Sequence, residues 1–192
     1  MARAHSAKAA KDYPAHGIKK GDTYYYWAHF RGPKQMSKTP PRQSQLTGSA
    51  KLSNVYAADE ALQDALGSAT VPEDISGALE EAVTAVNDCI EEYEEAVSNL
   101  EEGFPNGCPQ LEETNEAKDN LEAWRDELES AQTDVENLDA SDFVDEGAEP
   151  DEGEEKRAED AKVESFDDLY PSERDAMMEE AQSLAGNVSC PL

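Results

Sequence analysis

Aromatic and positively charged side chains are concentrated near the start of the sequence, and their types suit contact with phosphates and nucleobases. The residues are Lys19, Lys20, Tyr25, Trp27, Arg31, Lys34, Lys38 and Arg42. Lysine and arginine neutralise phosphates, whereas exposed tyrosine and tryptophan rings stack on bases or enter a groove. We therefore treat these residues as the candidate binding site for DNA, RNA or another partner.

A β-hairpin within residues 21–49 would position this set. Thr23–Phe30 is dense in strand-favouring residues, Arg31–Lys34 supplies a glycine and a proline for a turn, and Gln35–Thr39 forms the return strand. Alternation along the first strand places aromatic rings on both faces of the hairpin. In the competing interpretation, one aromatic face packs on the following helix and the lysines are simply solvated.

Charge is divided unevenly along the 192 residues. Residues 1–52 contain ten Lys and Arg against two Asp, a net charge of +8, whereas residues 53–192 contain six against 42 acidic residues, a net charge of −36. An acidic region of that size repels nucleic acid, so phosphate contacts would have to come from the first 52 residues. Adaptation to a high-salt host is an alternative explanation of the acidity.

Residues 1–20 are rich in alanine and lysine, and we expect them to form a flexible basic arm. They contain no apolar signal core, and no stretch of the chain has the roughly 18 to 20 apolar residues of a membrane span. These features predict a protein in the cytoplasm of its host cell with no membrane partner. Cys89, Cys108 and Cys190 form no regular framework, which fits a reducing compartment.

Apolar residues recur at helical spacing through the middle of the chain. A first helix is predicted from about Ala50 to Leu66, with Ser49 as its cap. Two longer helices are predicted over 72–102 and 110–138, separated by a Gly- and Pro-rich break, and the apolar residues of the first recur every three or four positions, which is typical of a coiled coil. Those apolar residues are Ile75, Leu79, Val83, Val86, Ile90, Tyr93, Val97 and Leu100.

A short connection makes the two long helices an antiparallel hairpin. The predicted fold class is therefore mainly α, with an antiparallel coiled-coil hairpin in the helical region 50–138, a small N-terminal β-hairpin and a disordered acidic linker. Two helices alone bury little apolar area, so the first helix, the β-hairpin or a second subunit must cover part of the seam.

The C-terminal part divides into a linker and a short helix. Residues 139–165 are acidic and of low complexity, which predicts a linker too charged to form a core. Residues 166–192 contain a helix over Ser172–Ala185 that follows Pro171 and stops at Gly186. That helix could serve as a tethered docking motif, or it could fold back on the seam of the hairpin.

Features of an enzyme active site are not recognisable. Acidic pairs are expected by chance in so acidic a chain, and no His, Ser or Cys is placed beside them as nucleophile and base. His5, His16 and His29 lack regular ligand spacing, and the sequence contains no glycine-rich phosphate loop. We therefore predict a non-enzymatic protein with no cofactor and no metal.

Two resemblances bear on these expectations. The Lys19-Lys20-Gly21, Tyr24-Tyr25, Trp27 and Ser37–Pro41 motifs, followed by Ser44–Thr47, resemble the start of a family of small uncharacterised phage and prokaryotic proteins. That resemblance implies an acidic helical hairpin through about Leu138 but no established activity. A strand rich in Tyr and Trp, a Gly turn and a strand ending in Ser-Lys-Thr is also similar to the small arm-binding domains of phage-type integrases.

Three functions are compatible with the sequence. The first is a virus-like accessory protein whose helical hairpin makes protein contacts, with a partner or with a second copy, and whose aromatic β-hairpin is its binding end. The second is DNA or RNA binding by residues 1–52 through the candidate residues. The third is an acidic mimic of nucleic acid that occupies a basic host protein.

Overall fold

The protein is mainly helical, with a small antiparallel sheet at its N-terminal end. The computed structural model describes residues 1–145 and 162–192. Its strands are β1 (His5–Lys8), β2 (Thr23–Trp27) and β3 (Gln35–Ser37), and its helices are α1 (Gln43–Leu46), α2 (Ala50–Leu66), α3 (Pro72–Gly103), α4 (Pro109–Glu136) and α5 (Pro171–Gly186). Short 3₁₀ turns occur at Pro14–His16, Ala140–Phe143 and Phe166–Asp168.

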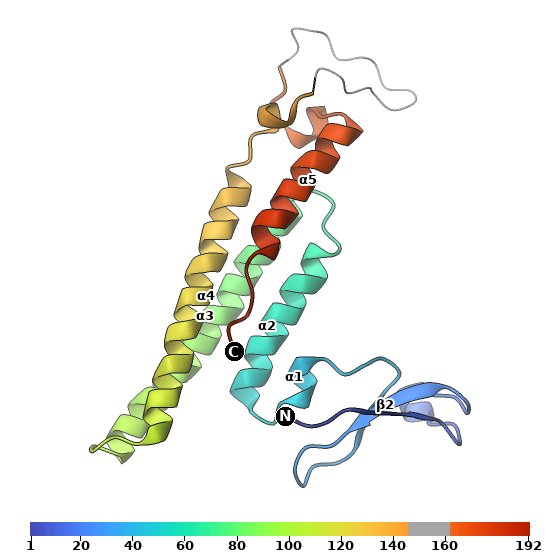
Figure 1. Ribbon diagram of the computed structural model, residues 1–192, viewed down its shortest axis with the longest axis vertical. Helices are drawn as coiled ribbons and strands as arrows, with labels where there is room; N and C mark the ends of the chain where they lie inside the picture. Colours follow the sequence, from blue (N-terminus) through green and yellow to red (C-terminus); the bar gives the residue numbers. More distant parts are fainter. Residues whose placement is uncertain (146–161) are drawn as a thin grey trace.

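Helices α3 and α4 form the antiparallel hairpin expected from the sequence (Figure 1). Their apolar seam is buried, and its fully buried members are Ile75, Leu79, Val86, Leu121, Trp124 and Leu128. Helix α3 begins at Pro72, whose missing N–H costs nothing in a first turn. The side chain of Asp74 accepts hydrogen bonds from the backbone of Thr70 and Val71, and these bonds lower the pKa of Asp74.

Helices α2 and α5 cover this seam except near the connection between α3 and α4 (Figure 1). Val55, Ala58 and Leu62 of α2 join the core of the hairpin, as do Ala181 and Ala185 of α5. Helix α2 has the bounds expected from its apolar spacing, and the Oγ atom of Ser49 accepts from Leu52 N at its start. Lys51 at the start of α2 reaches the Glu92 carbonyl and the Tyr93 ring of α3, and beyond this level the hairpin continues as α3 and α4 alone (Figure 1).

The C-terminal helix folds back on the hairpin, which decides between the two alternatives that the sequence left open. Ala181 and Ala185 have no exposed surface, and Val188 in the segment after α5 is also buried in the main core. Small residues let α5 approach α3 and α4 closely, and this burial stabilises the contact. Helix α5 is therefore part of the bundle and not a free docking motif.

The described parts of the expected linker, residues 139–145 and 162–165, are structured. Residues 146–161 lie outside the described part of the chain, but the flanking residues are ordered. Ala140 and Val163 are buried in a small cluster with Leu169 and Met177. The carboxylate of Glu173, which is only 2% exposed, accepts from Asp145 N at 2.8 Å and from Tyr170 N at 2.8 Å. A few apolar residues thus order both ends of a segment that composition alone predicts to be disordered.

The expectation of a flexible arm over residues 1–20 is wrong. His5–Lys8 forms an edge strand that pairs antiparallel with β2, and Ala9 and Ile18 are buried beneath the sheet. A short alternation of alanine and polar residues is a weak signal for a strand. Pairing with β2 nevertheless satisfies the hydrogen-bonding groups of the β1 backbone and places the alanines on the same face as Tyr24. The N-terminal unit is therefore a three-stranded sheet, in the order β1-β2-β3, and not a hairpin alone.

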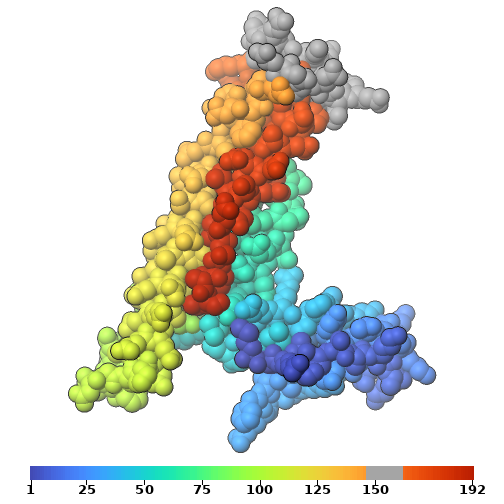
Figure 2. Space-filling model, viewed as in Figure 1, coloured from blue at the N-terminus to red at the C-terminus, as the bar shows by residue number. Residues whose placement is uncertain are grey.

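The sheet projects sideways from the end of the helical bundle (Figures 1 and 2). Its connection to the bundle passes through α1. Ser44 at the start of α1 donates through its N–H and its Oγ atom to the Glu60 carboxylate on α2, at 2.9 and 2.6 Å. Ser53 Oγ on α2 donates in turn to the Ser44 carbonyl at 2.9 Å. Within the described residues, no helix is long and apolar enough to cross a membrane.

The docking of α5 can be tested with one buried and one exposed substitution on the same helix. Ala185→Glu places a carboxylate without a partner in the core, and we expect it to destabilise the docked helix by about 2 kcal/mol or more. Gln182→Glu adds the same charge at an exposed position and should have little effect. Denaturant unfolding combined with limited proteolysis of α5 measures both variants. Equal protection of the two would contradict the docked arrangement.

Candidate nucleic-acid interface

The first face of the sheet holds a row of aromatic rings built on alternate residues. Tyr24 and Tyr26 of β2 lie beside Tyr13 and His5, with ring centroids 5.8 Å apart for Tyr13 and Tyr24 and 5.9 Å apart for Tyr24 and Tyr26. His5 stacks on Tyr26 with centroids 5.3 Å apart. Tyr24 is buried against Ile18, while Tyr13 and Tyr26 are half-buried. Burial raises the pKa of the Tyr24 hydroxyl, and the neighbouring Tyr13 adds to that increase.

Lysine side chains lie over this row of rings. The Lys34 ammonium is 3.7 Å from the Tyr26 ring centroid and 5.9 Å from that of Tyr24. The Lys11 ammonium lies 5.6 Å from the Tyr13 ring. Each cation is attracted to the ring face and remains exposed to solvent, so it keeps its charge available for an anionic partner. The first face is therefore a compact aromatic layer topped by positive charge.

The second face does not offer the stacking ring that we expected. Trp27 is only 6% exposed, and its Nε1 atom has no hydrogen-bond partner within the described residues. Tyr25 on the same face is half-buried. Burying so large an aromatic ring contributes more to stability than leaving it in water. Trp27 is therefore a structural residue of the sheet and not a platform for bases.

The remaining candidate residues divide between the sheet and the bundle. Lys19 and Lys20 lie at the turn before β2, where their backbone N–H groups donate to the carboxylates of Asp22 and Asp12. Their side chains stay exposed. Lys34 and Lys38 lie at the two ends of β3, and the Lys38 ammonium forms an ion pair with Asp22 at 3.2 Å. The sheet thus carries most of the predicted positive residues.

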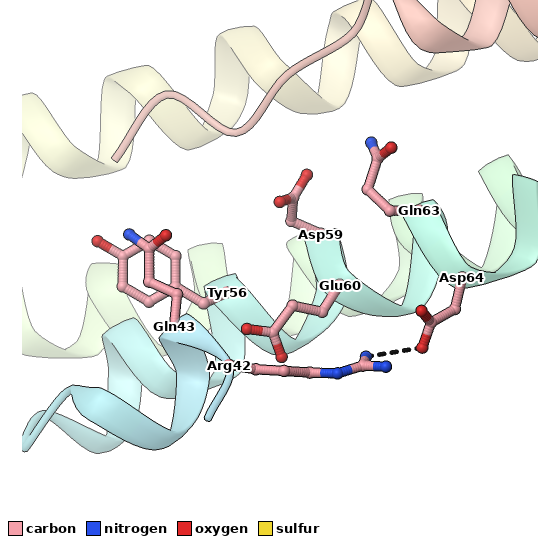
Figure 3. Close-up of a pocket in the computed structure, with 7 residues that line it drawn as sticks. All are labelled: Arg42, Gln43, Tyr56, Asp59, Glu60, Gln63 and Asp64. Atoms are coloured by element: carbon pink, nitrogen blue, oxygen red, sulfur yellow. Dashed lines mark ion pairs between the residues drawn. The ribbon is translucent and has the colours of Figure 1, made fainter. Parts of the chain in front are cut away.

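Arg42 does not belong to this surface. It caps α1, and its guanidinium bonds to the Asp64 carboxylate on α2 at 2.6 Å, as Figure 3 shows. The pKa of Arg42 is raised mainly by that hydrogen bond. Both partners are half-exposed or more, so the pair adds little free energy but keeps Arg42 occupied.

A shallow groove of about 390 Å³ separates α1 from α2 beside this ion pair (Figure 3). Its lining residues are Arg42, Gln43, Tyr56, Asp59, Glu60, Gln63 and Asp64. Burial raises the pKa of Asp59, and the charge of Glu60 adds to this increase, whereas the Cys190 backbone N–H opposes it by bonding to Asp59. The polar groups of the groove are largely satisfied by the protein itself, so we assign it a structural role.

Sequence reasoning missed the contributions of His5, Lys11 and Tyr13 to the candidate surface. These residues come from the segment expected to be a flexible arm, and they reach the surface only through pairing of β1 with β2. The isolated bridge between Tyr13 and Ile18 closes the connecting loop over the sheet. The alternation of His5, Ala7 and Ala9 was the available signal, although alanine is a weak strand former.

The rest of the described chain offers little other chemistry. In residues 1–145 and 162–192, no group of three His, Cys, Asp or Glu side chains is arranged to hold a metal ion. The three cysteines are not joined in disulfides. Burial raises the pKa of the Cys89 thiol to about 11, with smaller contributions from Glu92, Asp88 and Cys190, so its reactive thiolate is scarce at neutral pH.

Comparison with known proteins identifies no relative. No protein-family model, curated protein or solved structure matches this chain.

The ion pair between Lys38 and Asp22 should make the stability of the sheet depend on pH in the acid range. A backbone hydrogen bond from Lys19, then the bond to Lys38, lower the pKa of Asp22 from its ordinary value of 3.8. The stability that Asp22 contributes is therefore present above the ordinary pKa and is lost as the pH falls through the lower, folded value. We expect Asp22→Asn to make the sheet less stable at neutral pH and its stability less dependent on acid.

Near-ultraviolet circular dichroism of the tyrosine row, recorded during thermal melts from pH 7 down to pH 2, would measure this effect. Asp74→Asn is the control, because Asp74 also has a lowered pKa but lies at the start of α3, away from the sheet. If both variants changed the tyrosine signal equally, the signal would be reporting global acid unfolding and not the Asp22 interaction.

Proposed function

We propose that this protein is a non-enzymatic accessory protein that binds nucleic acid through the positively charged face of its N-terminal sheet. The observation that supports this most is the separation of charge between structural units. The first 58 residues contain only two acidic residues, Asp12 and Asp22, of the 44 in the whole chain. The sheet therefore stays basic in a protein whose net charge is −28.

High-salt adaptation explains acidic helices but does not explain a basic sheet. A protein selected only for a hydrated acidic surface would place carboxylates on its exposed strands and turns as well. Here the exposed side chains of Lys8, Lys11, Lys19, Lys20 and Lys34 occupy those positions. Dense positive charge on one unit of an acidic protein is the pattern expected for binding a polyanion.

The projection of the sheet reduces the repulsion from the helices. The sheet extends sideways from the bundle (Figure 2). Electrostatic interactions in water decay over about 10 Å at 0.1 M salt, so a nucleic acid on the outer part of the sheet is largely screened from the helical carboxylates. Exposed lysines would make phosphate contacts that do not depend on sequence. Sequence-tolerant binding follows from this composition.

Removal of two lysines tests this proposal on the full chain. Lys11→Gln with Lys34→Gln should weaken binding to DNA of any sequence and reduce the slope of log affinity against log salt by about two, one for each lost phosphate contact. Fluorescence anisotropy with labelled DNA across about 50 to 200 mM salt measures both quantities. Lys118→Gln is the matched control, because Lys118 lies on α4 and pairs with Glu122. Absence of binding at low salt would refute the proposal.

The uncovered end of the helical hairpin favours a second function, in protein contacts. Phe104 at this end is 54% exposed, and Val97, Leu100 and Leu111 are only half-buried because α2 and α5 do not reach them. We call these four residues the apolar tip. Exposed glutamates surround it, at Glu94, Glu95, Glu101, Glu102, Glu112, Glu113 and Glu116. Its chemistry suits a basic partner with an apolar patch, and the basic sheet of a second copy has that composition.

Self-association measured by sedimentation velocity tests the second function. If the tip of one copy binds the sheet of another, association should weaken with salt and should fall about tenfold or more on Phe104→Ser. Val144→Ser is the control, because Val144 is also exposed, at 42%, but lies near the opposite end of the hairpin. A monomer at all protein and salt concentrations would rule out this self-contact.

A further inference from the structure

We propose that Phe30 is a wedge that inserts between stacked base pairs of duplex nucleic acid, with Arg31 and Lys34 holding the flanking phosphates. This inference rests on the proposed function of the sheet and adds to it the mode of binding and the preferred form of nucleic acid. It is carried by the position of Phe30 at the apex of the connection between β2 and β3.

Phe30 is the most exposed large apolar side chain of the described residues, at 89%. The connection that carries it extends away from the sheet as a narrow projection (Figure 2). Burial of an apolar side chain of this size normally stabilises a protein. In the described residues, only the neighbouring Arg31 guanidinium lies against the Phe30 ring. The ring is therefore presented to a partner and makes no contribution to the core.

The turn that presents Phe30 is held in an unfavourable backbone conformation. Gly32 N donates to the His29 carbonyl at 2.9 Å and closes the turn. Arg31, between them, has a φ angle of +60°, which is otherwise found only at glycines in the described chain. Glycine would adopt this φ at a lower energetic cost than arginine. Local stability therefore favours glycine at position 31, and the arginine side chain is not explained by the stability of the turn.

The surroundings of the ring identify the chemistry of the partner. The Arg31 guanidinium carbon lies 5.1 Å from the Phe30 ring centroid, and Lys34 follows at the start of β3. No Asp or Glu occurs anywhere between Asp22 and Asp59. A hydrophobic partner protein would not require this excess of positive charge. Apolar side chains flanked by arginine and lysine are used by duplex-binding proteins to unstack and kink a base step.

Duplex is favoured over single-stranded nucleic acid because Phe30 stands alone. Single strands are held by several exposed rings on which successive bases stack. In this sheet Tyr24 and Trp27 are buried, and Tyr26 already lies under Lys34. A single ring at a narrow apex can separate two stacked base pairs but cannot support a run of unstacked bases.

The decisive experiment compares Phe30→Ala and Phe30→Leu in the full chain, with Val144→Ala as the control at another exposed apolar side chain, which lies away from the sheet and from the apolar tip. Binding to duplex and single-stranded DNA would be measured across a salt series. Unwinding would be followed by relaxation of closed circular DNA with a topoisomerase, and bending by energy transfer between the ends of a short duplex. These readouts separate insertion from simple phosphate contact.

We expect Phe30→Ala to weaken duplex binding about tenfold, to leave the salt slope unchanged and to abolish unwinding and bending, because stacking is lost while the phosphate contacts remain. Phe30→Leu should retain much of the distortion, since leucine is also an effective wedge. Val144→Ala should match the natural chain in every measurement.

The possible failures are distinguishable. If the natural chain bound duplex DNA with lysine-dependent affinity but Phe30→Ala unwound and bent it equally well, the wedge would be wrong and the proposed function would stand. A loss confined to single-stranded DNA would also overturn the wedge. If the natural chain bound no nucleic acid at low salt, both the wedge and the proposed function would fall together.

Discussion

Burial of the apolar seam between α3 and α4 is the interaction on which the rest of the structure depends. The outer faces of these helices are crowded with carboxylates, and their mutual repulsion opposes a compact state. Burial of Leu79, Trp124 and Leu128 offsets that repulsion, and α2 and α5 enlarge the buried area. The contacts of α1 with α2 and the ordered ends of the acidic segment are arranged around this bundle, whereas the sheet has its own small cluster of buried residues.

Much of the helical architecture could be predicted because its cause is local. Apolar residues at three- and four-residue spacing, with Pro72 at one end and the Gly- and Pro-rich break at the other, determine α3 and α4 closely. The return of α5 could only be left open, because a short apolar stripe fits a core and a partner equally well. The alanines of α5 distinguish a core helix from a docking motif only when the helices packed against them are known.

The N-terminal unit was harder to predict because its order depends on contacts between distant residues. β1 has weak strand preference of its own and is ordered by its backbone pairing with β2 and by Ile18 and Tyr24. Trp27 was expected to be exposed because composition cannot tell which side of a strand faces the protein. The sequence placed the positive residues in one group, whereas the structure separates Arg42, which pairs with α2, from those on the sheet.

The unequal lengths of the helices have a consequence for motion. Helix α3 has 32 residues and is about 48 Å long, whereas α2 has 17 and α5 has 16. Helix α2 reaches α3 only as far as Glu92 and Tyr93, and beyond them the hairpin is a pair of helices with sparse contacts. Local opening costs least where buried contacts are few, so amide-exchange lifetimes should shorten progressively from Leu79 and Leu128 toward Gly103. The molecule has one rigid end and one end that frays.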